Sequence, residues 1–222
     1  MTVAPSSPAG SSHEASLHSA NDAVRGLAQR GEVRRYRKGT ILIEEGDRGE
    51  TIYIILSGRL RAYSAAANGR EITYGSYGPG EYLGEMSLDG GVRSASVATT
   101  EASVCAVIGR ETLRDYIKEH PEFAFELLSK VIRRARAATL SAKNLALNDV
   151  YGRLKLLLES MPSERKGALA VVAERLTHQD LANRLGCSRE MISRVMKDLE
   201  NGGYVEQHDG RLAMCRALPA RW

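Results

Sequence analysis

One segment, from Leu176 to Met214, constrains the fold of this chain more than any other part of the sequence. Thr177 followed three residues later by Asp180 is the pattern of a capping box, which predicts that a helix begins there. Gly186 is suited to end that helix. Ser188 is a good N-cap for a second helix after a turn of only a few residues. This short spacing predicts a helix-turn-helix.

The second helix of this segment has two unlike faces. At about 100° per residue, its apolar side chains fall in one sector. The opposite sector carries Arg189, Glu190, Ser193, Arg194 and Lys197. After the helix, YVEQHDGRLAM predicts a β-hairpin around Asp209 and Gly210, which would form a wing.

The polar sector has the chemistry needed to read duplex DNA. Arginine can donate two hydrogen bonds to guanine, glutamate can accept one from cytosine, and lysine can contact phosphate. A solvated helix face is the alternative interpretation. Because cap, turn glycine, short turn and wing occur together, we expect this helix to enter the major groove.

Upstream, residues 34–108 consist of short β-rich runs separated by glycines. Regular spacing of short strands with turn signals predicts a closed or folded-over antiparallel β domain. Glycines at positions 46, 58, 69, 80 and 84 stand where strands must reverse or backbones approach closely. With the helices that follow, this predicts the α+β class.

A long helix should begin near Pro121 and continue to about Asn148. A narrow seam of residues recurs along it at alternating steps of three and four, the spacing expected where two equivalent helices pack together. The seam consists of Leu128, Val131, Ala135, Ala138, Ala142 and Leu145. The pattern predicts a homodimer, although the helix could also cover its own β domain with another face.

Composition excludes several classes of protein. Apolar residues make up 43% of the chain and charged residues 26%, which is typical of a globular protein, and no apolar run is long enough to span a bilayer. The three cysteines are far apart, so we expect no disulfide framework, metal site or iron-sulfur cluster, and a cytoplasmic location.

Residues 1–22 should form a disordered polar tail rather than a secretory signal. No HExxH, GxSxG or Walker-type motif is present in a convincing context, so we expect no enzyme.

Between about residues 30 and 216 the chain resembles the CRP/FNR family of transcription regulators, with the closest likeness in LGCSREMISRVMKDLE and NLALNDVYGRL. The resemblance implies an N-terminal double-stranded β-helix, or β-roll, of the cyclic-nucleotide-binding type at residues 23–117. A dimerisation helix at 118–149 and a winged helix-turn-helix at 150–222 would follow it. Asp149 would be the hinge and the N-cap of the next helix.

The resemblance also implies how DNA is read. The family's base-reading arginine, glutamate and arginine match Arg189, Glu190 and Arg194, and each half of a palindromic site should resemble TGTGA. The other candidate DNA-binding residues are Thr177, Gln179, Ser188, Ser193 and Lys197. RNA polymerase is the further partner that the resemblance implies, and no membrane is involved.

The segment PGEYLGEMSLDGGVRSASV resembles the family's phosphate-binding cassette. A buried cyclic phosphate needs a cation and hydrogen-bond donors, which Arg93, the Ser94 hydroxyl and backbone N–H groups would supply. Glu85 would accept from a ribose 2′-hydroxyl, although Glu85 and Arg93 could instead form a structural ion pair. The candidate nucleotide-binding residues are Gly84, Glu85, Met86, Arg93, Ser94, Arg134 and Thr139.

The ligand itself is predicted only as a class. Where a cyclic-AMP-binding member has threonine then serine to meet adenine, this chain has Ala138 then Thr139, and its loop between Glu85 and Arg93 is shorter. Cyclic AMP is the first choice of effector, with no covalently bound cofactor. Cyclic di-GMP and ligand-independent action are alternatives within the family. A cyclic-nucleotide-binding regulatory subunit of an enzyme is the alternative of another class, but such a subunit would not need a helix-turn-helix.

Overall fold

The computed structural model describes residues 22–221, and the predicted tail otherwise lies outside the described residues. The described chain forms two compact units. Residues 22–64 and 74–134 belong to the first unit, and residues 65–73 and 135–221 belong to the second.

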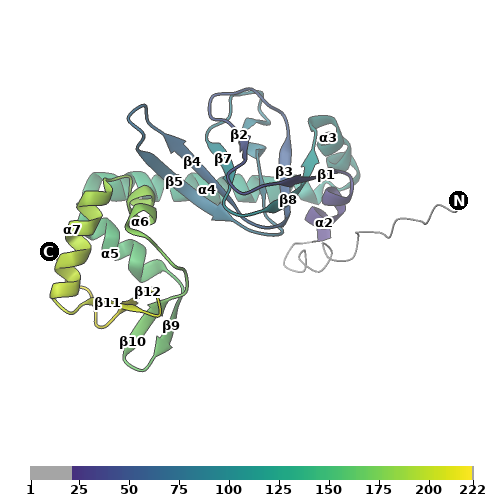
Figure 1. Cartoon of the computed structure of the whole chain (residues 1–222). Coiled ribbons are helices and arrows are strands. Elements are labelled where there is room, and N and C mark those ends of the chain that lie inside the picture. The colour runs from purple at the N-terminus through teal and green to yellow at the C-terminus, as the bar shows by residue number, and fades with distance from the viewer. Residues whose placement is uncertain (1–21, 222) are drawn as a thin grey trace, which may run out of the picture. The chain divides into compact units, whose positions relative to one another are not determined.

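The strands of the N-terminal half form two four-stranded antiparallel sheets, one in the order β1-β8-β3-β6 and the other in the order β2-β7-β4-β5 (Figure 1). Their bounds are β1 Glu32–Tyr36, β2 Ile41–Ile43, β3 Ile52–Ser57, β4 Leu60–Ala65, β5 Glu71–Tyr77, β6 Tyr82–Leu83, β7 Ser96–Thr99 and β8 Ser103–Ile108. Strand β3 lies between two partners and is buried at Ile52, Ile54, Ile55 and Leu56. This explains why its sequence is a continuous apolar run rather than an alternating one.

The predicted reversal glycines, at positions 46, 58, 69, 80 and 84, all have positive φ angles, which confirms that prediction. At Gly58, between β3 and β4, a Cβ atom would lie 2.5 Å from the carbonyl oxygen of Ala102. Both the backbone angle and the space therefore require glycine there.

Two short helices cover one end of the first sheet. Helix α2 spans Asp22–Gln29 and helix α3 spans Arg110–Glu119. The Tyr116 hydroxyl donates to the carbonyl of Ala23 at 2.7 Å, which joins the two helices. Helix α2 corrects the prediction, because Asp22 was assigned to the tail and no helix was expected after it.

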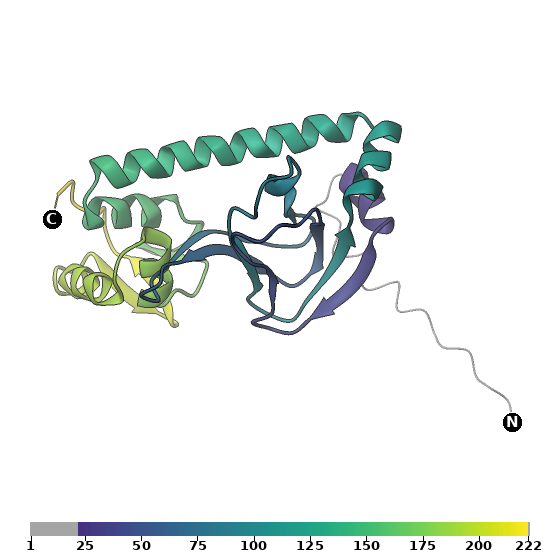
Figure 2. The same cartoon turned by 90° about the horizontal axis from the view of Figure 1, so that it is seen from above.

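Helix α4 runs unbroken from Glu122 to Leu147 (Figure 2), close to the predicted range. Only Phe123 is buried along it, where it packs with Tyr82 and Tyr116 in the core of the first unit. The rest of the helix is half-buried or exposed.

The C-terminal region has three helices, α5 Val150–Ser160, α6 His178–Leu185 and α7 Arg189–Asn201, around one apolar core. Its sheet has the order β11-β12-β10-β9, with bounds β9 Ser163–Lys166, β10 Leu169–Val172, β11 Val205–His208 and β12 Arg211–Met214. The predicted hairpin around Asp209 is β11–β12. Strand β9, for which no strand was predicted from the sequence, is an edge strand with every residue exposed.

Candidate functional site

The predicted cassette lies between β6 and β7. Gly84 precedes a short 3-10 helix, η2, at Glu85–Ser87, and its φ angle is 101°. A Cβ atom on Gly84 would lie 2.4 Å from the carbonyl oxygen of Thr51. Glycine is therefore what allows the cassette backbone to pass this close to the start of β3.

Arg93 points inward and holds the cassette together. Its Nη1 donates to the Gly84 carbonyl at 2.9 Å and to the Ser87 hydroxyl at 2.8 Å. Its Nη2 donates to the carbonyl and to the hydroxyl of Thr51, both at 3.0 Å. Burial lowers the pKa of Arg93, which is 6% exposed. These partners are neutral oxygens, so the guanidinium is not paired with Glu85 as the alternative interpretation had it.

Glu85 is the most unusual residue of the cassette. Its side chain is completely buried, and Arg134 of α4 forms an ion pair with its Oε1 atom through Nη1. The pair lacks hydrogen-bond geometry, and neither carboxylate oxygen has a hydrogen-bond partner among the described residues. A buried acceptor without a donor is costly, so this carboxylate is suited to receive a hydroxyl group from a ligand.

A second cation, Lys130, lies one turn before Arg134 on α4 and was missed by the sequence reasoning. Its ammonium donates to the carbonyl of Tyr82 and lies 3.3 Å from the centroid of the Tyr82 ring. Burial lowers the pKa of Lys130 to about 8. The four-residue spacing from Arg134 could have signalled a shared helix face, but a lysine is usually read as solvated.

Burial of Lys130 has a consequence for stability. The pKa of Lys130 in the folded chain is about 8, whereas that of an ordinary lysine is 10.5. Below pH 8, the need to keep Lys130 charged in the folded chain therefore lowers the free energy of unfolding by roughly 3 kcal/mol. That cost shrinks as the pH rises from about 8 to about 10.5, because the neutral folded form becomes available.

The other predicted ligand residues are more open. Ser94 is exposed, and Met86 is 43% exposed. The Thr139 hydroxyl donates to the carbonyl of Ala135, one turn back along α4, at 3.0 Å. The structure thus brings together Gly84, Arg93, Glu85 and Arg134, and the ligand-binding roles of all the predicted residues stay predictions.

In the C-terminal region, local hydrogen bonds define the predicted helix-turn-helix. Thr177 and Asp180 form the complete capping box of α6, and Gly186 ends that helix with a φ angle of 63°. The Ser188 hydroxyl accepts from the backbone N–H of Met191 and begins α7. Asp149 likewise caps α5 by accepting from Gly152 at 2.7 Å.

Helix α7 presents the expected polar face. Ile192, Met196 and Leu199 are buried on its inner side. The outer residues Arg189, Glu190, Arg194 and Lys197 are exposed. The pKa of the Glu190 carboxyl is lowered by a hydrogen bond from its own backbone and by Ser188, so it stays an ionised acceptor near neutral pH.

Besides Thr177 and Ser188, two more of the predicted DNA-binding side chains have protein partners. Ser193 is half-buried, and its hydroxyl lies 2.9 Å from Nδ1 of His178, the first residue of α6. Gln179 donates to the Asn183 side chain at 2.7 Å. Ser193 therefore differs from its exposed neighbours on α7 and joins the two helices of the motif.

All six residues of the predicted seam on α4 are exposed. Further large apolar side chains on the same helix are also exposed: Phe125 at 73%, Ile132 at 41%, Leu140 at 57% and Leu147 at 71%. An exposed apolar strip of this length is unusual on a monomer and is typical of an interface.

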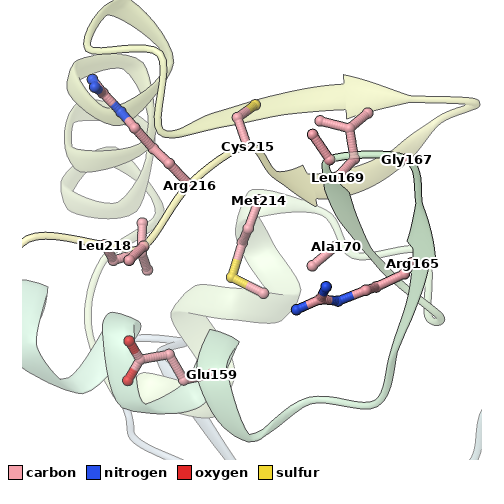
Figure 3. Close-up of a pocket in the computed structure, with 11 residues that line it drawn as sticks. Glu159, Arg165, Gly167, Leu169, Ala170, Met214, Cys215, Arg216 and Leu218 are labelled. Carbon is pink, nitrogen blue, oxygen red and sulfur yellow. The ribbon is translucent and has the colours of Figure 1, made fainter.

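A surface hollow of about 330 Å³ lies beside strands β10 and β12 (Figure 3). Apolar side chains of Leu169, Met214 and Leu218 line it together with Arg165 and Arg216. No predicted site residue is in its lining.

Within residues 22–221, no cluster of His, Cys, Asp or Glu has the grouping needed to hold a metal ion. Over the same residues, no helix combines the length and the apolar character that crossing a membrane requires.

Comparison with known proteins identifies the family. Residues 33–120 match the cyclic nucleotide-binding domain, and residues 175–204 match the bacterial regulatory proteins of the crp family. A CRP-like cAMP-activated global transcriptional regulator of Mycobacterium tuberculosis is 34% identical over 176 residues, covering 77% of this chain and 78% of that protein. The chain belongs to the crp family. Like the family's other members, it is a DNA-binding transcription regulator, here with a cyclic nucleotide-binding domain.

Other members of the crp family agree with this chain in sequence and fold. The cyclic AMP receptor protein of Thermus thermophilus is 32% identical, covering 83% of this chain and 84% of that protein. The solved structure of CLP, a c-di-GMP responsive global regulator of Xanthomonas campestris, has a TM-score of 0.76 at 26% identity, covering 86% of this chain and 97% of that one. The predicted family and α+β fold class are confirmed.

The inward bonding of Arg93 leads to a stability prediction for this crp-family chain. Arg93→Ala would leave the Gly84 and Thr51 carbonyls without their donor and should lower the free energy of unfolding by roughly 3 kcal/mol. Urea unfolding followed by circular dichroism measures this. Arg35→Ala, which removes an exposed arginine of β1, is the control and should change stability by less than about 0.5 kcal/mol. Equal stability of the two variants would refute the inward role.

Proposed function

We propose that this transcription regulator acts as a homodimer whose binding to a palindromic DNA site is controlled by a cyclic nucleotide, with cyclic AMP as the effector. The observation that carries the proposal is the fully buried Glu85 carboxylate, which lies against Arg134 and has no hydrogen-bond donor within residues 22–221. A ribose 2′-hydroxyl would supply that donor.

A ligand that binds Glu85 also changes the surroundings of Arg134, which is part of α4. Binding can therefore favour one arrangement of two paired α4 helices over another, by the difference in ligand affinity between the two arrangements. In the proposed dimer, that arrangement places two copies of α7 in successive major grooves about one DNA turn apart.

On DNA, Arg189, Glu190 and Arg194 read bases in half-sites that resemble TGTGA, while Lys197 meets the backbone. Thr177, Gln179 and Ser188 supply further contacts near the helix N-termini, and Ser193 positions α7 through His178. RNA polymerase is a second macromolecular partner, and the regulator works in the cytoplasm without a covalently bound cofactor.

Cyclic di-GMP is the second candidate effector. CLP of Xanthomonas campestris is c-di-GMP responsive, and one feature of this chain also favours that effector. Arg93, Lys130 and Arg134 surround a single buried acid, Glu85, so the cassette has more positive charge than one phosphodiester neutralises. A ligand with two phosphodiesters would balance that charge better.

The exposed hydroxyl of Ser94 allows a test of ligand binding that leaves the buried network intact. Ser94→Ala should weaken cyclic AMP binding about fivefold, because one hydrogen bond to the phosphate is lost. Calorimetric titration with cyclic AMP, cyclic GMP and cyclic di-GMP measures this. Ser76→Ala, at an exposed serine of β5, is the matched control and should bind as wild type does. If the wild type gave no binding heat with any of the three nucleotides, control by a cyclic nucleotide would be excluded.

Recognition by α7 is tested at Arg189. Arg189→Ala should weaken binding to a palindrome of TGTGA half-sites by about 1–3 kcal/mol and relax the preference at one base position. Fluorescence anisotropy at fixed salt measures both effects. Arg165→Ala removes an exposed arginine from edge strand β9 and should leave the base preference unchanged. Wild-type affinity and preference in Arg189→Ala would show that the wrong face has been assigned.

The seam on α4 is tested at Val131, which is 38% exposed. Val131→Arg would place two like charges against each other at a twofold contact and should convert the dimer to a monomer. Sedimentation equilibrium gives the mass. Lys143→Glu, also on α4 but outside the seam, should leave the dimer intact. A dimeric Val131→Arg protein would exclude this seam as the interface.

A further inference from the structure

We propose that Lys130 is a positioning residue of the cyclic-nucleotide site, which fastens β6 to α4 and places a proton-dependent positive charge beside the bound phosphate. The proposal rests on the function proposed above and extends it to a residue outside the cassette. It makes ligand affinity, and through it DNA binding, sensitive to mildly alkaline pH.

The position of Lys130 comes from two contacts with one residue. Its ammonium donates to the main-chain carbonyl of Tyr82 and lies 3.3 Å from the centroid of the Tyr82 ring. Tyr82 belongs to β6, whose strand ends at Leu83, directly before the cassette glycine. One turn further along α4, Arg134 contacts Glu85. Two successive turns of α4 therefore hold the cassette at residues 82 and 85.

The charge of Lys130 interacts with other charged groups of the site. Glu85 of η2 and Arg134 of α4 both interact with it electrostatically, as do Glu81 before β6 and Glu126 one turn earlier on α4. Of these acids only Glu85 is completely buried. Because Glu85 is buried and Lys130 is half-buried, an anion beside Arg134 is attracted by the Lys130 charge more strongly than it would be in solution.

Ligand binding and protonation of Lys130 must be thermodynamically linked. If the charged form strengthens binding, then binding must raise the affinity of Lys130 for its proton. Burial lowers the pKa of Lys130 to about 8 in the free protein, so the two proton states exchange within an accessible pH range. Near pH 7 Lys130 is almost fully charged, and as the pH rises through 8 both the charge and the strength of the Tyr82 anchor decline.

The experiment is calorimetric titration of the full chain with cyclic AMP and with cyclic di-GMP between pH 7 and pH 9. For the wild type, affinity should fall about fivefold over this range if the phosphate raises the pKa of Lys130 by one unit. At pH 8.5, binding should also take up protons, seen as a dependence of the heat on the ionisation enthalpy of the buffer.

Two variants and a control separate a proton-linked role from a merely structural one. Lys130→Arg keeps its charge and should bind as tightly at pH 9 as at pH 7, without proton uptake. Lys130→Met should bind more weakly than the wild type at pH 7 and show a flat pH profile. Lys143→Met, at an exposed lysine of the same helix, should keep the wild-type profile.

The outcomes distinguish this proposal from the function on which it rests. If the wild type binds and Lys130→Arg has the same pH profile as the wild type, the role of Lys130 alone is overturned. Failure of the wild type to bind either nucleotide at any pH would overturn cyclic-nucleotide control and this role together. Thermal unfolding of each variant shows whether it is folded, and Lys130→Arg decides the question if Lys130→Met is not.

Discussion

The ion pair between Glu85 and Arg134 is the interaction on which the proposed ligand site of the first unit depends. A carboxylate without exposed surface is stable as an anion only beside a cation, and α4 supplies that cation. The pair remains incomplete, since the carboxylate oxygens lack hydrogen-bond donors among the described residues. In the proposed function, a ligand hydroxyl would supply the missing hydrogen bond without displacing Arg134.

Arg93 also has a structural role in the cassette. Because its guanidinium is bonded to Thr51, Gly84 and Ser87, the cassette is held in shape by the same residue that the sequence assigns to the phosphate. Phosphate binding by Arg93 would exchange protein oxygens for ligand oxygens, and only the difference between them contributes to affinity. Backbone N–H groups, the exposed Ser94 hydroxyl and the charges on α4 then become more important for retaining the ligand.

Features set by local sequence were predictable, and features set by distant contacts were not. The caps at Thr177 and Ser188 depend on residues three positions away, so the helix-turn-helix could be placed from sequence. The contacts of Lys130 with Tyr82 and of Ser193 with His178 join different elements, and no periodicity reports them. Strand β9 was missed for a related reason: as an exposed edge strand it has no buried face to leave an alternating pattern.

In the proposed function, helix α4 contains both a residue that contacts the cassette and the predicted dimer seam, without an intervening loop. Arg134 contacts the buried acid of the cassette, and the next residue, Ala135, belongs to the predicted seam. Neighbouring residues of a helix point about 100° apart, so one helix can serve the cassette and a second copy at once. Any rotation or shift that alters the contact of Arg134 must also move Ala135, and with it the seam from Leu128 to Leu145. The boundary between the two compact units falls between these same two residues, inside the continuous helix α4.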